Sequence, residues 1–316
     1  MGAYLARRLA ATALTLLGVS VLVFGMIRLV PGTVVEQLLG QAAIASPEVV
    51  ASFRAYFGLD RAAHVQYAQW LGGVLRGDFG VSWLSGRPVL GLFLERLPVS
   101  AELAVLAVGW SLLLGIPLGT GAAVWRGGTR DSAIRLAATL GLSLPAFWQG
   151  TVLILLFSIY LGWMPSLTWA PLSERPLANL ITLALPALTL GTATAAMITR
   201  MSRSSMLDVL GREYVRTARA KGLPERDVTF RHALRNALIP VVTVAGVQLG
   251  YIVGGIVVVE DVFTLPGVGR LLLDAIFQRD YPVVQGVIFL LGAIFMLLNL
   301  GVDLLYAVLD PRLRRG

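Results

Sequence analysis

The chain has 316 residues, of which 56% are hydrophobic and 14% charged, and its mean hydropathy is +0.76. A soluble globule of this composition would expose large apolar areas, so these values exclude a soluble protein and indicate an integral membrane protein. The net charge of +8 is typical of basic residues that anchor apolar segments at the membrane surface, and no motif for binding nucleic acid accompanies it. Cysteine is absent, which excludes disulfides and thiolate metal sites.

Six apolar segments are long enough to cross a bilayer as helices, because a hydrocarbon core of about 30 Å takes about 20 helical residues. Barrel strands of roughly 10 residues are too short to explain them. We therefore predict an all-α integral membrane fold with six transmembrane helices. The predicted spans are residues 9–30, 101–124, 137–161, 178–199, 238–259 and 283–307.

The basic residues lie at alternate ends of these spans. Seventeen of the 26 Lys and Arg residues flank one side, in the N-terminus, the second connection, the fourth connection and the C-terminus. The positive-inside rule places this side in the cytoplasm, so both termini are predicted to be cytoplasmic. A cleavable signal peptide is the competing interpretation of residues 1–30, but their apolar run is long and no small-residue cleavage pattern follows it.

Three parts follow from this arrangement. Residues 1–30 form the first transmembrane helix, residues 31–98 a small extracytoplasmic subdomain, and residues 99–310 a five-helix core. The core includes a long polar loop, residues 200–237, which is predicted to lie in the cytoplasm.

The polar loop is predicted to form two helices joined at a glycine. Leu207, Leu210, Tyr214 and Ala218 recur every three or four residues, which predicts one helix with a single apolar stripe. Gly222 can end that helix in a left-handed cap, and Pro224 can open the next one. A solvated amphipathic loop and a docking surface for a protein partner both fit this pattern.

The spans carry their own candidate features. Gly246, Gly250 and Gly254 repeat every four residues on the fifth span, which predicts a close-packing face, either within the chain or toward a second, partner chain. Pro145 and Pro186 are expected to kink the third and fourth spans. Three polar residues of the spans could line an aqueous path or form hydrogen bonds between helices: Gln149, Gln248 and Tyr251.

Several motifs together resemble one family. The run from Glu213 to Pro240, EYVRTARAKGLPERDVTFRHALRNALIP, closely resembles the cytoplasmic EAA loop of bacterial ABC transporter permeases of the dipeptide, oligopeptide and nickel branch. The family's acidic residue is absent, since Arg216 stands in its place, and Glu213 is the nearest upstream acid. Further motifs of this chain also resemble that branch, and together they cover essentially the whole chain. They are ARR, VPG, GDFG, SLPAFW, LPGVGR, RDYPVVQG and VDLLYAVLDPR.

This resemblance implies a type I ABC importer permease in the inner membrane. Its partners would be a second homologous permease, two cytoplasmic ABC ATPase subunits and an extracytoplasmic solute-binding protein. The chain lacks a phosphate-binding G-x-x-x-x-G-K-[ST] motif, so no cofactor or metal is expected on it, and ATP and Mg²⁺ would bind the ATPases. The resemblance assigns the ATPase-coupling surface to Glu213, Tyr214, Arg216, Thr217, Ala218, Arg219, Ala220, Lys221, Gly222, Leu223 and Pro240.

The cargo implied is a di- or oligopeptide, with nickel or glutathione as alternatives. Two other classes compete: a self-sufficient secondary carrier and a membrane enzyme. No internal repeat supports the carrier. No catalytic constellation supports the enzyme, because the two histidines, His64 and His232, are predicted on opposite sides of the membrane.

Overall fold

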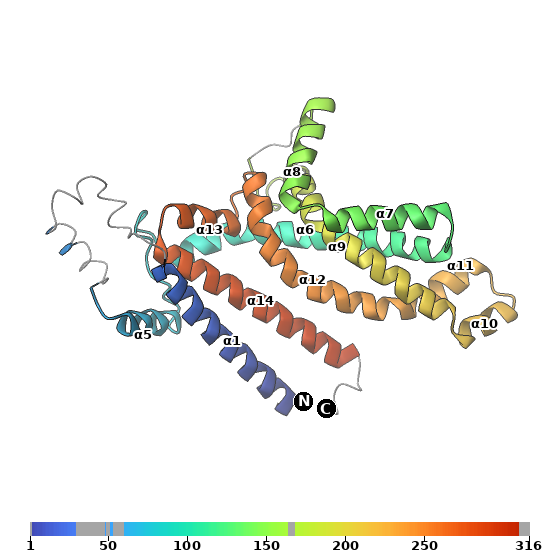
Figure 1. The fold of residues 1–316 in the computed structure, drawn as a ribbon, viewed down its shortest axis with the longest axis horizontal. Helices are drawn as coiled ribbons and strands as arrows, with labels where there is room; N and C mark the ends of the chain where they lie inside the picture. The colour runs from blue at the N-terminus through green and yellow to red at the C-terminus, as the bar shows by residue number, and fades with distance from the viewer. Residues whose placement is uncertain (1, 30–47, 49–50, 53–59, 164–167, 310–316) are drawn as a thin grey trace. The chain divides into compact units, whose positions relative to one another are not determined.

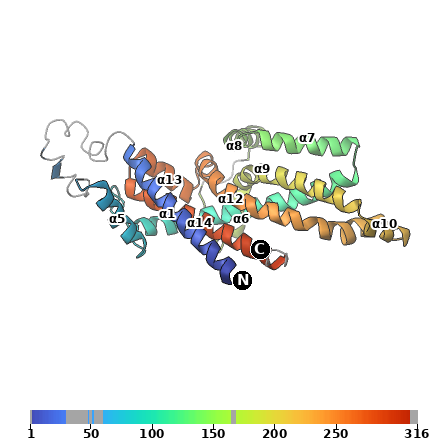
Figure 2. The ribbon, with the colours of Figure 1, turned by 60° about the horizontal axis from the view of Figure 1, so that its bottom comes forward.

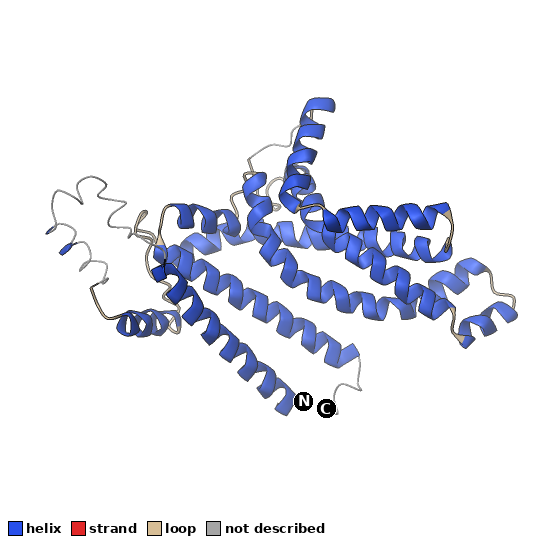
Figure 3. Cartoon of the chain, in the orientation of Figure 1, coloured by secondary structure: helices blue, strands red, loops and turns tan. Residues whose placement is uncertain are grey.

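A computed structural model describes residues 2–29, 48, 51–52, 60–163 and 168–309. Within these ranges the chain is helical, and the only β pairing is an isolated bridge between Val81 and Pro88 (Figure 3). The all-α prediction is confirmed. Of the predicted subdomain over 31–98, residues 31–47, 49–50 and 53–59 lie outside the described residues. The helices form two compact units, residues 1–98 with 267–300, and residues 99–266 with 301–315.

The first unit contains α1 (Gly2–Leu29), α5 (Ala63–Val74), the start of α6 (Val89–Val124), α13 (Val268–Phe277) and most of α14 (Tyr281–Leu309). Its apolar core joins α1, α6, α13 and α14 through Val23, Val89, Val268 and Val287. Ser20 of α1 and Tyr67 of α5 share a hydrogen bond of 2.8 Å between their hydroxyl oxygens. Buried Asp280 accepts hydrogen bonds from the Ser82 hydroxyl and the Trp83 amide, which fixes the turn before α6 to the start of α14.

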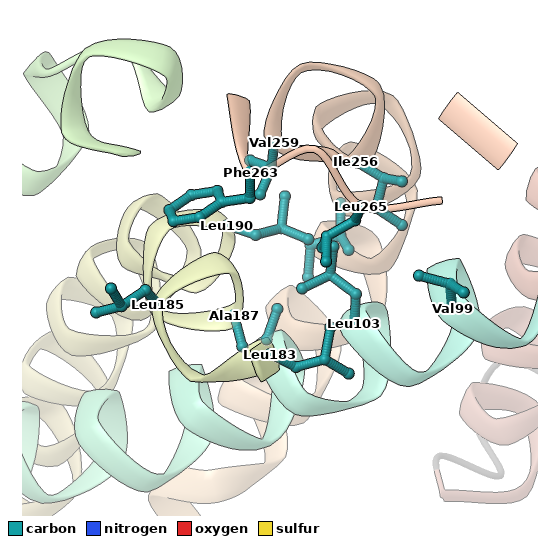
Figure 4. Close-up of a cluster of buried hydrophobic side chains, with 12 residues drawn as sticks. Val99, Leu103, Leu183, Leu185, Ala187, Leu190, Ile256, Val259, Phe263 and Leu265 are labelled. Atoms are coloured by element: carbon teal, nitrogen blue, oxygen red, sulfur yellow. The ribbon is translucent and has the colours of Figure 1, made fainter. Parts of the chain in front are cut away.

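The second unit contains the remainder of α6 and the other helices of the described residues. They are α7 (Thr129–Ser143), α8 (Ala146–Leu155), η1 (Leu156–Tyr160), α9 (Pro176–Leu210), α10 (Glu213–Ala220), α11 (Glu225–Asp227), η2 (Val228–Leu234) and α12 (Arg235–Val262). Figure 2 shows α7 alongside α9. A buried cluster of hydrophobic side chains around Leu103, Leu183 and Val259 joins α6, α9 and α12 (Figure 4).

Glycines let α6 and α9 approach closely in this unit. A Cβ at Gly119 would lie 2.4 Å from the Thr199 carbonyl oxygen, and one at Gly115 would lie 2.6 Å from Ile198 Cγ2. On α9, a Cβ at Gly191 would lie 2.7 Å from the Ala107 carbonyl oxygen. Small residues spaced by four allow such backbone contact in membrane helices, so Gly115 and Gly119 form the tight face of α6.

Within the described residues, five helices are long and apolar enough to cross a membrane, and the predicted third span is the exception. Residues 137–161 are not one straight helix, because α7 and α8 meet at an angle of 107°. Pro145 lies at the break, where it has no backbone N–H to donate to the Gly141 carbonyl. The Gln149 side chain donates to the Leu144 carbonyl at 2.8 Å and to the Gly141 carbonyl at 3.4 Å. Pro186, by contrast, lies inside α9 without ending it.

Candidate functional site

Residues 211–234 of the polar loop connect the end of α9 to the start of α12, and α10 and α11 form the tip of the second unit (Figure 1). The single helix predicted through Leu207 and Ala218 is wrong, since α9 ends at Leu210 and α10 begins at Glu213. This break turns Val215 and Ala218 onto Val228 of η2, and the three side chains form a buried cluster. Tyr214, predicted on the apolar stripe, is largely exposed.

The turn after α10 has the hydrogen bonds of a Schellman cap. Gly222 has a φ of 78°, its amide donates to the Arg219 carbonyl at 2.9 Å, and the Leu223 amide donates to the Ala218 carbonyl at 3.4 Å. The positive φ requires glycine or a tolerant residue such as asparagine. A Cβ at Gly222 would meet no atom within 4 Å, so the constraint is the backbone conformation alone.

An ion pair closes the same turn. Arg219 Nε donates to Glu225 Oε1 at 2.6 Å, and Nη2 donates to Oε2 at 3.2 Å. The hydrogen bond to Glu225 raises the pKa of the Arg219 guanidinium above its ordinary value. The acid paired within the loop is therefore Glu225, whereas the sequence pattern pointed to Glu213.

Most of the coupling residues proposed from the sequence lie on the outside of this turn. Arg216, Thr217, Ala220, Lys221 and Leu223 are exposed. Toward α12, the Asn236 amide donates to the Tyr214 hydroxyl at 2.9 Å, which ties α10 to the start of the next long helix. Pro240 lies within α12, outside the turn.

A partly buried ion pair near this end of α9 was not foreseen from the sequence. Arg203 of α9 donates through Nε and Nη2 to the two carboxylate oxygens of Asp131, at 2.8 and 2.7 Å. The Gly127 amide also donates to Asp131 at 3.0 Å. The pair joins the beginning of α7 to the end of α9. Its partners are 72 residues apart, so no local pattern signals it.

A cavity of about 540 Å³ lies between α8, α9 and α12. All three polar residues that the sequence singled out in the spans line it. Its polar side chains are Gln149, Thr189, Thr194, Thr243, Gln248 and Tyr251.

Comparisons with known proteins place these features in a family. The family described as binding-protein-dependent transport system inner membrane component matches residues 115–315, and the family of the N-terminal parts of such components matches residues 1–104. The chain belongs to this permease family. A putative peptide transport system permease protein of Brucella abortus (strain 2308) is 42% identical over 314 residues, which cover 99% of both chains. The glutathione transport system permease protein GsiC of Salmonella typhimurium is 43% identical and covers 98% of both.

The fold of the permease is also found among solved structures. A chain of the MetNI methionine ABC transporter, in inward-facing conformations, matches with a TM-score of 0.58 and 17% identity. The match covers 69% of this chain and 96% of that chain. Together with the family match, it confirms the prediction of a type I ABC importer permease fold, in a multi-pass protein of the inner membrane.

The predicted glycine face of the permease divides into two parts. A Cβ at Gly246 would lie 2.7 Å from Val302 Cγ1 of α14, so this glycine packs within the chain. Gly250 is buried, whereas Gly254 has no atom within 4 Å of a Cβ placed there.

Among the described residues, no three His, Cys, Asp or Glu side chains are grouped so that they could hold a metal ion.

Proposed function

We propose that the chain is the permease subunit of an ATP-driven importer of di- or oligopeptides. A solute-binding protein would deliver the peptide, which would cross between this chain and a second homologous permease. Two cytoplasmic ATPase subunits would bind and hydrolyse ATP with Mg²⁺, and this chain would bind no cofactor. The names of the Brucella and Salmonella relatives support a peptide cargo, with glutathione, itself a tripeptide, as the alternative.

The observation that carries this proposal is the α10–Gly222–α11 turn. It lies at the junction of two long helices, α9 and α12, and presents exposed basic and apolar side chains beyond them. The Val215–Ala218–Val228 cluster and the Tyr214–Asn236 hydrogen bond connect the turn to those helices. A force applied to the turn by an ATPase would therefore reach both helices as a rigid-body movement. The positive-inside rule places this turn and both termini in the cytoplasm.

The orientation can be tested by single cysteines, since the chain has none of its own. Cysteine at Gly2, Gly128 or Arg226 should be protected from an impermeant thiol reagent in intact cells. Cysteine at Ser85, Ser173 or Gln278 should react. Labelling of position 226 from outside would reverse the proposed topology.

The coupling role is tested by Gly222→Val. A β-branched residue is strongly disfavoured at φ 78°, so the turn should distort although a Cβ at this position would clash with no neighbouring atom. We expect normal membrane abundance and pairing with the second permease, but loss of copurifying ATPase and of peptide uptake. Gly222→Asn, which tolerates positive φ, and the exposed variant Arg226→Gln should retain both. Wild-type uptake by Gly222→Val at equal abundance would remove the loop from the coupling mechanism.

The purified subunit tests whether ATP hydrolysis requires separate ATPase subunits. This subunit alone in lipid should hydrolyse no ATP, because its sequence has no phosphate-binding loop of the G-x-x-x-x-G-K-[ST] type. Hydrolysis by the single chain would contradict the importer proposal and favour a different class of transporter.

A further inference from the structure

The cavity between α8, α9 and α12 has a lining that contains amides and hydroxyls but no charge. Of the described residues that line it, none is Asp, Glu, Lys, Arg or His. Its volume of about 540 Å³ falls within the roughly 300–1,000 Å³ typical of small-ligand sites. The lining therefore offers hydrogen bonds and apolar contact to a small molecule, without an ionic partner.

Two of its polar groups lie deep in the predicted span without a partner. Gln248 is near the middle of α12, and Tyr251 follows one turn later with 72% of its surface exposed. Neither the Gln248 amide nor the Tyr251 hydroxyl is hydrogen-bonded to another described residue. Hydrocarbon satisfies no polar group, so this face of α12 is costly to expose to lipid. It must face water or another protein.

We propose that this cavity is the subunit's half of the substrate passage, and that Gln248 and Tyr251 hydrogen-bond the backbone of a passing peptide. The inference rests on the proposed function, peptide import. An amide side chain and a hydroxyl can each donate and accept, as peptide N–H and C=O groups require. Because the peptide backbone is common to all sequences and the lining is uncharged, the passage does not select the charge of the peptide's side chains.

The same lining excludes a bare nickel ion as the species recognised there. Nickel prefers imidazole and other nitrogen or thiolate ligands. The described residues around the cavity include no His, Cys, Asp or Glu. A peptide is the better chemical match among the cargoes carried by this family branch.

The test is to place a charge in the passage with Gln248→Glu. The complete transporter, with its second permease, ATPases and binding protein, is reconstituted in proteoliposomes containing ATP. Uptake of a mixed tripeptide library is read by mass spectrometry, and each peptide is expressed as the ratio of variant to wild type. This ratio cancels the selectivity of the binding protein. For acidic peptides it should fall about tenfold below the ratio for neutral ones, because like charges repel strongly at low dielectric. For basic peptides it should not fall.

Gln278→Glu is the matched control, since it makes the same change at an exposed position of the chain outside the cavity. Its ratios should be equal for acidic, neutral and basic peptides. Equal ratios for Gln248→Glu, with normal uptake, would overturn the passage assignment and leave peptide import standing. Wild-type proteoliposomes that take up no peptide would overturn the proposed function itself.

A labelling experiment keeps the inference testable if the charged variant does not fold. Gln248→Cys and Tyr251→Cys should react with a water-soluble thiol reagent, with or without ATP, and peptide-loaded binding protein should slow the reaction. Leu113→Cys, exposed on α6 but outside the cavity, should stay unreactive as a lipid-facing position. If Gln248→Cys were as unreactive as Leu113→Cys, both with and without ATP, this face of α12 would contact lipid and the passage assignment would be wrong.

Discussion

Two helices of the second unit, α9 and α12, are both long and apolar but differ in how much they are buried. The most apolar stretch of α9 has a mean hydropathy of 1.7 and is 67% buried. The most apolar stretch of 18 residues within Glu225–Val262, which includes α12, has a mean hydropathy of 2.0, and 22% of that stretch is buried. The more apolar helix is thus the less buried one. Apolar side chains are equally compatible with lipid and with protein, so hydropathy identifies a span without showing what it contacts.

Small residues explain the difference better than apolarity does. The buried helix has its backbone in contact with α6 at Gly115, Gly119 and Gly191. The open helix has a glycine with free space beside it, Gly254, and it also carries Gln248 and Tyr251, which line the cavity. The same four-residue spacing of glycines therefore marks a closed face on α6, which packs on α9, and a partly open face on α12.

The largest expected effect is at the closed face, from Gly119→Val. The new Cβ would lie 2.4 Å from the Thr199 carbonyl oxygen, a backbone atom that cannot move aside without separating α6 from α9. We expect most of the folded protein to be lost, measured as membrane abundance and monodispersity after extraction. Gly109→Val, at an open position of the same helix, is the control. Equal abundance of the two variants would contradict the close crossing.

A smaller loss of stability is expected from Asp131→Asn, which weakens the ion pair between α7 and α9. The amide cannot match the paired hydrogen bonds and the charge that Asp131 offers to Arg203, which leaves a partly buried guanidinium uncompensated. The melting temperature of the purified subunit should fall by several degrees. Asp208→Asn, an exposed acid of α9, should melt as wild type does. The same shift in both variants would mean that the pair does not hold α7 to α9.

The open face predicts a separation of folding from assembly. Gly254→Leu has free space around it, so the chain should fold at wild-type abundance. If the second permease covers this face, copurification of that permease should fall severalfold. Gly246→Leu, whose Cβ would lie 2.7 Å from Val302 Cγ1, should instead reduce the abundance of the chain itself. Similar behaviour of the two variants would remove the distinction between the two parts of the face.

The smallest effect is expected at the surface of the polar loop, from Glu225→Gln. The ion pair with Arg219 is exposed, and exposed pairs contribute little because water and salt screen them. Melting of the variant should match that of the wild type within error. A clear loss of stability would show that the turn is shielded from solvent in the purified protein.

The sequence alone was sufficient for the features that depend on neighbouring residues. Apolar length predicted the membrane-spanning helices, the glycine and proline of the loop predicted its turn, and Gly222 has the positive φ expected of it. These outcomes depend on local propensity and on transfer into hydrocarbon, which a short stretch of sequence contains in full. The family was recognisable for the same reason, since its motifs are contiguous runs.

Only the tertiary structure decided which distant residues meet. It joins Asp131 to Arg203, which are 72 residues apart, and bends the third span at Pro145 by 107°. It also brings Gln149, Gln248 and Tyr251 to one cavity. Each of these depends on how helices pack. In lipid, close packing rather than apolarity determines how helices are arranged. The arrangement therefore depends on contacts between residues that are far apart in the chain.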